Sequence, residues 1–509
     1  MKNKMSLFFV LSLLSINLAF SENYPLKKIS TNTKTLHRKR RTLSGKEDSF
    51  LENVYGDSHN LYYYYATLYL GKKKKIPQTY ILDTGSPTTT SPCNKCRSCG
   101  KHINSPYDLD SDSDIIKCYT DSCNLVPSSD CTDHKCGFSI SYSEGSQLAV
   151  FFTMQEVYLE MINKTPNITT KSFKIPIGCT TKETHLFTTQ LADGIMGLNN
   201  GGKSFVTLLF NQKIISKNLF TICFGQNDGY FSIGDIDTSF HNSNIEYIPL
   251  IPGESNFYVN LNQIRIGEEI IPVNNYRGFI DSGTTISYFP NEIYNSIINN
   301  FNSICNNIPD KKCGKFKNVQ ELGYCGFFKT KEDKQKALEE YWPNITLNFE
   351  GHNYTLRGID YSYEYNDDKE EGACLGFEGE RTSKITLGGT FMHNHDIIFD
   401  KDNQKIGFAA ADCNRRKLKM NNNENSNSKI DNTNEAVLEE KETDKNGKNF
   451  NFNNLVFYII LSFLLIIVLI IIFIFLKNLF NKIKSKNYHP QIDDTSQTQK
   501  EGKVTIEIK

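Results

Sequence analysis

The sequence has no net charge, because 57 lysines and arginines balance 57 aspartates and glutamates. Proteins that bind the phosphate backbone of nucleic acids usually carry an excess of basic residues, so this balance excludes nucleic acid as the expected partner. The chain has a single tryptophan, but 34 phenylalanines and 26 tyrosines provide ordinary material for an apolar core. Its 509 residues leave room for two or three domains.

Cysteine is absent before residue 93 and after residue 413, so all fourteen cysteines lie in one central body. An even number of cysteines in such a body is typical of disulfides formed in the oxidising secretory pathway. The run Cys93, Cys96 and Cys99 has a spacing that would also suit zinc, with His102 or His134 nearby, but this compartment favours disulfides and we expect no metal. We expect seven disulfides, and spacing alone leaves their pairing open. The cysteines are Cys93, Cys96, Cys99, Cys118, Cys123, Cys131, Cys136, Cys179, Cys223, Cys305, Cys313, Cys325, Cys374 and Cys413.

The two ends of the chain have the composition of targeting and anchoring segments. Residues 1–21 combine two lysines, an apolar run and small residues before the expected cut, which is typical of a signal peptide. An uncleaved anchor is the alternative, but the apolar run is short for a span. Residues 455–476 carry no charge and would extend about 33 Å as a helix, enough to cross a bilayer core. Lysines follow at once and favour a cytosolic tail, 477–509.

The segments between these ends differ in composition. Residues 22–55 are polar and basic, and their Arg-Lys-Arg-Arg run is either a processing site or part of a solvated leader. Residues 414–454 are rich in Asn, Lys, Glu and Asp, with too little apolar material to fold, and we predict a disordered stalk. The body has short alternating runs of β-branched and aromatic residues, which predict an all-β fold. Helical spacing is confined to stretches such as 205–215 and 291–305.

One stretch of the body carries an aspartate in a turn that follows an apolar run. In TYILDTGSPTTT, residues 79–90, Asp83 begins the triplet Asp-Thr-Gly. Such a triplet occurs by chance too often to decide anything alone. About 200 residues further on, roughly one domain length, GFIDSGTTISYFP places Asp281 in the same order of residues. Each aspartate is followed downstream by an apolar-glycine element, DGIMGLNN (193–200) or ITLGGTFMHNHDIIFD (385–400), so the body contains a two-fold internal repeat.

With these motifs and the ending IGFAAADC, the body resembles the pepsin-type (A1) aspartic proteases over residues 61–413. The resemblance implies a bilobal all-β enzyme with its active-site cleft between the lobes, here 56–222 and 223–413. It implies that Asp83 and Asp281 share a proton and activate a water molecule, with no cofactor or metal.

The resemblance also implies roles for the neighbours of the two aspartates. Two hydroxyls would bond across to the opposite backbone, two glycines would allow close approach, and two further hydroxyls would bond the outer carboxylate oxygens. These pairs are Thr84 and Ser282, Gly85 and Gly283, and Ser86 and Thr284. The repeat is broken at Pro87, which has no backbone N–H where its counterpart Thr285 has one.

Enzymes of this family close a hairpin flap over the site, and the flap carries a tyrosine. SISYSEGSQ, 139–147, supplies Tyr142, and the turn at Glu144 and Gly145 suits a hairpin. A hairpin without a catalytic role is the alternative.

The dense cysteines of residues 93–136 are similar to the insert of nepenthesin-like plant enzymes. That resemblance implies four disulfides within the N-terminal lobe. Memapsin-like relatives imply three pairs in the C-terminal lobe: Cys223–Cys413, Cys305–Cys313 and Cys325–Cys374.

The insert, the C-terminal span and the YSEGS flap together resemble the plasmepsin V branch of the family. In that branch a flap glutamate and a downstream glutamine hold a substrate arginine, and the matching residues are Glu144 and Gln190. The alternative is that Glu144 only forms the turn. Ser143 departs from the branch, which has an unpaired cysteine there.

We therefore expect a monomeric type I membrane protease whose lumenal body cleaves polypeptides of the secretory pathway, and the resemblance to this branch implies cleavage after an Arg-x-Leu-like motif. The endoplasmic reticulum is the favoured membrane, and other secretory or surface membranes also fit. The alternatives are a broad digestive or shedding protease and a non-catalytic peptide-binding homologue. Four sequons are expected to carry glycans: Asn163, Asn167, Asn344 and Asn353.

Overall fold

The computed structural model describes residues 49–414, apart from 58–62, 73–74, 110–113, 128–129, 143–144, 161–168, 170–171, 321, 367–369 and 382. The expected signal peptide, stalk, membrane span and tail lie outside the described residues, as does most of the leader. Within the described part of the chain, no helix is long and apolar enough to cross a membrane.

Strands dominate the described body, as the alternating sequence pattern predicts, and the fold is mostly β. The N-terminal half contains β1 (Phe50–Asp57), β2 (Tyr63–Leu70), β3 (Ile76–Asp83), β4 (Thr90–Pro92), α2 (Asp121–Asn124), β5 (Asp130–Thr132), β6 (Lys135–Ser141), β7 (Gln147–Leu159), β8 (Phe173–Glu183), η2 (His185–Thr188), β9 (Gly194–Gly197), α3 (Phe205–Asn211), β10 (Leu219–Phe224) and β11 (Asp228–Ile233).

The C-terminal half has more helix, and α4 occupies the second stretch of helical spacing. It contains η3 (Thr238–Phe240), β12 (Glu246–Pro249), β13 (Tyr258–Ile266), β14 (Glu269–Ile280), β15 (Ser287–Pro290), α4 (Asn291–Asn306), η4 (Pro309–Lys311), β16 (Lys315–Val319), β17 (Gly323–Phe328), α5 (Lys331–Lys336), η5 (Ala337–Tyr341), β18 (Ile345–Phe349), β19 (His352–Leu356), β20 (Ser362–Asn366), β21 (Glu371–Leu375), β22 (Phe377–Glu380), β23 (Ile385–Leu387), α6 (Gly389–Met392), β24 (His395–Asp400) and β25 (Lys405–Ala410).

The internal repeat of the sequence appears as a repeat of strand pairings. In the N-terminal half β3 runs parallel to β9, and β4 runs parallel to β8. In the C-terminal half β14 runs parallel to β23, and β15 runs parallel to β22. Strands β9 and β23 are the two apolar-glycine elements. Each aspartate-bearing strand therefore has the same kind of neighbour in both halves.

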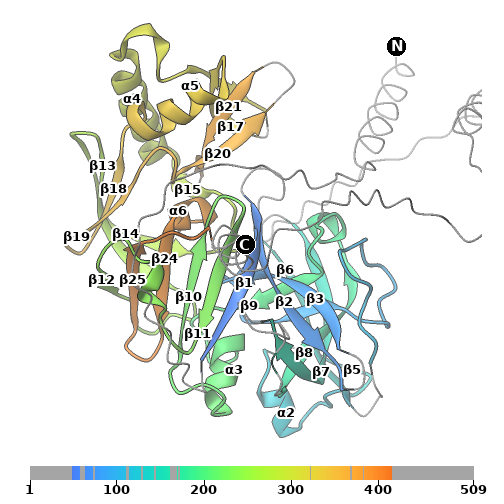
Figure 1. Ribbon diagram of the computed structural model, residues 1–509. Helices are drawn as coiled ribbons and strands as arrows, with labels where there is room; N and C mark the ends of the chain where they lie inside the picture. The colour runs from blue at the N-terminus through green and yellow to red at the C-terminus, as the bar shows by residue number, and fades with distance from the viewer. Residues whose placement is uncertain are drawn as a thin grey trace, which may run out of the picture. The chain divides into compact units, whose positions relative to one another are not determined.

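A continuous sheet joins the two halves. Its strand order at the junction is β12-β25-β24-β10-β11-β1-β2, and β10 of the first half pairs with β24 of the second, with Cys223 opposite Asp396. Strand β1 lies between β11 and β2 near the centre of the molecule (Figure 1). This strand overlaps the end of the expected leader, 22–55. Its Glu52 and Val54 are buried, so the packed body extends at least to residue 50.

Aromatic side chains pack across this joining sheet. Phe220 stacks on Phe399 with ring centroids 4.6 Å apart, and Phe257 meets Phe399 edge-on at 4.7 Å. All three side chains are fully buried. Burying one phenylalanine contributes about 1.5–3 kcal/mol, so this contact holds the halves together in addition to the backbone hydrogen bonds.

All fourteen cysteines form disulfides, which confirms the expected seven bridges. The three C-terminal pairs implied by the resemblance are present: Cys223–Cys413, Cys305–Cys313 and Cys325–Cys374. The N-terminal lobe holds four internal bridges: Cys93–Cys179, Cys96–Cys99, Cys118–Cys131 and Cys123–Cys136. The cysteine run that had a zinc-like spacing is thus occupied by sulfur–sulfur bonds.

The disulfides with the longest and the shortest sequence separation should stabilise the fold by very different amounts. Cys223–Cys413 joins residues separated by 190 positions, whereas Cys96–Cys99 spans 3. Loop-closure entropy predicts a loss of about 5 kcal/mol in the free energy of unfolding for the Cys223→Ser/Cys413→Ser variant, and about 2 kcal/mol for Cys96→Ser/Cys99→Ser. Guanidinium unfolding of both variants measures the contrast. Equal losses would contradict the entropic account.

Candidate active site

The backbone of each aspartate is fixed by the strand that runs parallel to its own. Leu198 donates its N–H to the Asp83 carbonyl at 2.8 Å, at the end of β3. Asp281 follows β14 directly and donates its N–H to the Leu387 carbonyl at 2.9 Å. The apolar-glycine elements thus hold the two turns through these backbone hydrogen bonds. Glycine at 194 is required there, because an added Cβ would lie 1.9 Å from the Thr90 carbonyl.

Four reciprocal hydrogen bonds join the two turns across the lobe boundary. The Thr84 hydroxyl donates to the Ile280 carbonyl at 3.0 Å, and the Ser282 hydroxyl donates to the Leu82 carbonyl at 2.6 Å. In return, the Thr84 N–H donates to Ser282 Oγ at 3.0 Å, and the Ser282 N–H donates to Thr84 Oγ1 at 2.9 Å. Both side chains are buried. The cross-bonds expected of this pair are therefore present in both directions.

The carboxylates receive donors from their own turns. The Gly85 N–H donates to Asp83 Oδ1 at 2.8 Å, and the Gly283 N–H donates to Asp281 Oδ1 at 3.1 Å. The Thr284 hydroxyl donates to Asp281 Oδ2 at 2.6 Å. These contacts orient both carboxyl planes toward the lobe boundary.

The outer hydroxyls of the repeat do not behave alike. Ser86 is the counterpart of Thr284, and its hydroxyl offsets part of the rise in the Asp83 pKa, after the larger effects of burial and of Asp281. Its geometry is nevertheless not that of a hydrogen bond, and the buried Ser86 Oγ has no hydrogen-bond partner among the described residues. The donor expected at the outer oxygen is present at Asp281 and not at Asp83.

Both carboxyl pKa values are raised. Burial is the main cause for Asp83, and repulsion from the Asp281 carboxylate is the second; together they raise its pKa to about 7. Burial is also the main cause for Asp281, where the Thr284 hydroxyl and the backbone donors limit the rise in pKa. Two carboxyls in this setting hold a proton at acidic and near-neutral pH, because removing it would place two negative charges side by side.

Each glycine of one triplet faces the aspartate of the other. A Cβ added at Gly85 would lie 2.7 Å from Asp281 Oδ1, and one added at Gly283 would lie 2.5 Å from Asp83 Oδ1. Real Cβ atoms do not approach oxygen so closely. Glycine at these two positions is therefore what lets the carboxyls approach each other, and neither φ angle is in the left-handed region.

The expected flap is a hairpin of β6 and β7. Ser141 pairs with Gln147, and the turn between them is closed by hydrogen bonds from Tyr142 N–H to the Ser146 carbonyl at 2.9 Å and from Gly145 N–H to the Tyr142 carbonyl at 3.0 Å. Gly145 has a φ of 94°, which glycine adopts readily. The Tyr142 ring meets Phe187 edge-on at 5.1 Å. Glu144 lies outside the described residues.

Gln190 lies in residues 184–191, the segment that supports this hairpin. Its side-chain amide donates to the Ala192 carbonyl at 3.2 Å, and its own carbonyl contacts His102 Nδ1 at 3.0 Å. The structure therefore brings Gln190 to the flap side of the N-terminal lobe, and among the described residues no donor bonds its side-chain oxygen.

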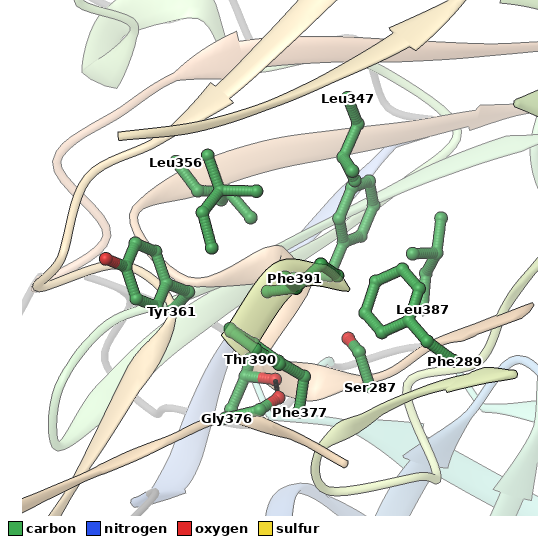
Figure 2. Close-up of a pocket in the computed structure, with 12 residues that line it drawn as sticks. Ser287, Phe289, Leu347, Leu356, Tyr361, Gly376, Phe377, Leu387, Thr390 and Phe391 are labelled. Atoms are coloured by element: carbon green, nitrogen blue, oxygen red, sulfur yellow. Dashed lines mark hydrogen bonds between the residues drawn. The ribbon is translucent and has the colours of Figure 1, made fainter. Parts of the chain in front are cut away.

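An apolar pocket lies elsewhere, inside the C-terminal lobe (Figure 2). Phe289 of β15, Leu387 of β23 and Phe391 of α6 converge on it with Leu347 and Leu356 of β18 and β19. No charged side chain lines it. It is a space between packed core side chains behind the Asp281 turn, and neither aspartate contributes to its lining.

Sequence reasoning missed a lysine that ties the two lobes together near the site. Lys401 follows β24, is buried, and donates through Nζ to the carbonyls of Asn199 at 2.8 Å and Gly201 at 3.1 Å. Asn199 in turn donates its N–H to the Ser86 carbonyl at 3.1 Å. Burial lowers the pKa of Lys401 to about 7. A lysine in an exposed-looking turn, DKDNQK, carries no sequence signal for this contact.

The predicted sequons divide by location. Asn344 and Asn353 are exposed, at the start of β18 and within β19. Asn163 and Asn167 lie outside the described residues. Glycosylation remains a prediction at all four.

The site and the fold identify the family. The profile of the eukaryotic aspartyl proteases matches residues 63–411, from β2 to the residue after β25. The chain belongs to this family. Membership places it in the aspartic-type endopeptidase class of hydrolases, as the resemblance implied.

Individual relatives are similar over most of the chain. Plasmepsin V of Plasmodium falciparum is 27% identical over 443 residues, which cover 72% of this chain and 73% of the relative. Aspartic proteinase nepenthesin-1 of Nepenthes gracilis is 24% identical over 408 residues, covering 76% and 85%. Among solved structures, basic 7S globulin from soybean superposes with a TM-score of 0.56 at 15% identity, covering 73% of this chain and 97% of that one. The last likeness shows the fold alone.

Replacing Gly85 or Gly283 by alanine should reduce peptide cleavage by at least about 100-fold, because an added methyl group would displace the opposite carboxyl and a small misplacement is costly. Gly202 provides a matched control, since a Cβ there meets nothing within 4 Å. The Gly202→Ala enzyme should retain wild-type activity. The measurement is kcat/KM on a fluorogenic peptide, with circular dichroism to verify folding. Near-wild-type activity of Gly85→Ala would refute the argument.

Proposed function

We propose that this chain is a membrane-anchored aspartic endopeptidase of the secretory pathway whose catalytic pair is Asp83 and Asp281. The observation that carries the proposal is the buried carboxyl pair, held by reciprocal cross-lobe hydrogen bonds and by two glycines that allow the carboxyls to meet. A scaffold used only to bind peptides would have no need of two mutually repelling acids with raised pKa values.

The pair can perform hydrolysis with one shared proton. The ionised carboxyl takes a proton from a water molecule as the water oxygen bonds to the scissile carbonyl carbon, while the protonated carboxyl gives its proton to the carbonyl oxygen. A gem-diol results. Its collapse breaks the C–N bond as one carboxyl passes its proton to the leaving nitrogen and the other, ionised carboxyl takes a proton from a gem-diol hydroxyl, which restores the shared proton. The proton belongs to the pair, so neither aspartate is assigned a fixed role.

The surrounding residues have supporting roles in this proposal. Thr84 and Ser282 fix the separation of the carboxyls, and Thr284 orients Asp281. The outer oxygen of Asp83 has no donor from Ser86, so it is the less stabilised of the two when ionised. In this proposal the hairpin with Tyr142 closes over bound polypeptide.

Several features support a lumenal body. The seven disulfides suit an oxidising compartment, and the similarity to plasmepsin V agrees with the secretory pathway. In this proposal residues 455–476 anchor the chain, residues 477–509 are cytosolic, and the endoplasmic reticulum is the favoured membrane. The enzyme acts as a monomer on secretory polypeptides.

The proposed specificity is for arginine, held by Glu144 of the flap and by Gln190. The side-chain oxygen of Gln190 accepts no hydrogen bond among the described residues, whereas its amide nitrogen is engaged with Ala192. A guanidinium donor would satisfy that oxygen together with the flap carboxylate. Cleavage then follows an Arg-x-Leu-like motif.

Activity should depend on pH in both directions. As pH rises through the raised pKa of Asp83, about 7, the pair loses its shared proton and cleavage falls. As pH falls below the raised pKa of Asp281, the pair gains a second proton and cleavage falls again. Asp83→Asn and Asp281→Asn should each lower kcat on the order of 10²–10⁴-fold. Initial rates on a quenched-fluorescent peptide library, from acid to neutral pH, measure both effects.

Stability provides an independent check on the same pair. A carboxyl whose folded pKa is raised stabilises the fold fully below its unfolded pKa, and this contribution is lost as pH rises through the folded value. Wild type should therefore lose stability between pH about 4 and about 7, and Asp83→Asn should lose less. If either asparagine variant cleaves peptides as fast as wild type, the proposed function is wrong.

The arginine preference has its own test. Peptides that differ only by arginine or lysine at the expected position should be cleaved with kcat/KM values at least about tenfold apart, since lysine cannot bond bidentately. Glu144→Gln should abolish this ratio, and Gln190→Ala should reduce it, both with an intact rate on an arginine-free peptide. Lys203→Gln, on an exposed loop of the same lobe, is the control variant. A library profile without arginine preference would contradict the proposed specificity and favour the broad-specificity protease.

A further inference from the structure

The side chain of His102 lies buried between its own cysteine-rich insert and residues 184–191, the segment that supports the flap. Its Nε2 is 3.0 Å from Glu183 Oε2, and its Nδ1 is 3.0 Å from the Gln190 carbonyl oxygen. The side chains of His102 and Glu183 are each only 2% exposed. Glu183 Oε2 also accepts the Gly100 N–H at 2.8 Å. Neither residue belongs to the catalytic pair or to the proposed arginine site.

These contacts determine the protonation state of the ring. A carbonyl oxygen only accepts, so Nδ1 must carry a proton to bond Gln190. Nε2 must carry a proton as well if it faces an ionised Glu183. Both nitrogens of a histidine are donors only in the charged imidazolium. Beside an ionised Glu183 the ring is therefore a buried imidazolium with two directed hydrogen bonds.

The ring joins two pieces of chain that run side by side. Ser98 and Lys182 form a parallel bridge, and the Glu183 N–H donates to the Ser98 carbonyl at 2.8 Å. The Ile103 N–H donates to the Leu191 carbonyl at 2.8 Å. The insert thus contacts both ends of residues 184–191. His102 bonds Glu183, directly before these residues, and Gln190, near their end.

The other side of the same segment holds the flap turn. The Leu186 N–H donates to Ser146 Oγ at 3.1 Å, and the Gln147 N–H donates to Thr184 Oγ1 at 2.9 Å. The Phe187 ring packs against Tyr142. Residues 184–191 therefore lie between the insert and the flap, so a change in how the insert holds them reaches the flap directly.

We propose that His102 is a positioning residue that, as an imidazolium bonded to Glu183 and Gln190, fixes residues 184–191 and thereby sets how tightly the flap side of the site binds substrate. This inference rests on the proposed protease function and adds a control of KM to it. It also gives the cysteine-rich insert a purpose, since the insert carries the histidine and anchors it through Cys96–Cys99 and Cys93–Cys179.

The hold of His102 on this segment is expected to weaken as pH rises. Burial lowers the pKa of His102, but the hydrogen bond and charge of Glu183, the hydrogen bond to the Gln190 carbonyl and, least, the charge of Asp193 outweigh it and leave the pKa raised. Glu183 and Asp193 are the charged groups that face the ring from β8 and from the strand start at β9. Above the raised pKa the ring keeps one N–H and loses one of its two bonds.

The test compares His102→Gln with His134→Gln in the full-length protein. His134 is an exposed histidine of the same insert, so its replacement controls for the loss of a histidine there. On the best-cleaved peptide of the library, His102→Gln should raise KM by about fivefold or more and change kcat less than twofold, because a glutamine has a single nitrogen and cannot occupy the positions of both ring nitrogens. His134→Gln should match wild type.

A second variant separates the charge from the hydrogen bonds. In Glu183→Gln a neutral His102 can donate to the Gln190 carbonyl and accept from the new amide nitrogen, so both contacts of the ring persist without a charge, whereas the Gly100 N–H loses its acceptor. Wild-type KM should rise with pH through the raised pKa of His102, and this rise should vanish in Glu183→Gln while KM stays near its acid-side value. NMR titration of ¹³C-labelled histidine should show the His102 pKa above 6.5 in wild type and lowered in Glu183→Gln.

Hydrogen exchange of residues 184–191 gives a readout that needs no catalysis. Exchange there should accelerate in His102→Gln and not in His134→Gln. An unchanged KM in His102→Gln, or unchanged exchange, overturns the inference, as does a fall in kcat that tracks a smaller folded fraction. If wild type cleaves no peptide, the proposed function fails, and the exchange comparison still decides whether His102 holds the segment.

Discussion

The reciprocal hydrogen bonds of Thr84 and Ser282 are the constraint on which the rest of the structure depends. Each aspartate is fixed within its own lobe by a parallel strand, and these four bonds fix one lobe's turn against the other. Burial and mutual repulsion oppose the approach of the carboxyls. The joining sheet and the aromatic contact of Phe220 with Phe399 supply the stability that offsets this cost.

Much of this frame could be predicted because the sequence states it twice. Two Asp-Ser/Thr-Gly turns and two apolar-glycine strands can hardly arise together by accident, and their repetition implies matching neighbours in space. Strands β9 and β23 do lie beside β3 and β14. The pairing of the six C-terminal cysteines follows from resemblance alone, since spacing leaves them many pairings; for the N-terminal lobe the resemblance implied four bridges and no pairing. The hydroxyl at Ser86 shows the limit of the repeat: its counterpart bonds Asp281, and it does not bond Asp83.

What the sequence could not indicate are contacts between segments that have no pattern in common. Strand β1 has the composition of the end of a polar leader, because its alternation is short and includes Glu52, yet it pairs with β11 and β2. Burial, with a smaller contribution from the charge of Glu160, raises the pKa of Glu52 well above its ordinary value. His102 and Lys401 similarly depend on which surfaces the fold brings together. Periodicity describes one element at a time and carries no information about such meetings.

The positions of these contacts divide the enzyme into two parts with different tasks. The two aspartate turns are bonded to Leu198 after β9, to Leu387 of β23 and to each other, and none of these bonds involves the flap hairpin. The flap and residues 184–191 are held instead by the cysteine-rich insert, through His102 and backbone bonds. In the proposed enzyme, changes in the insert would alter substrate binding without moving the carboxyls. Disulfides suit that arrangement, because a small insert with little core of its own needs a rigid base from which to position another segment.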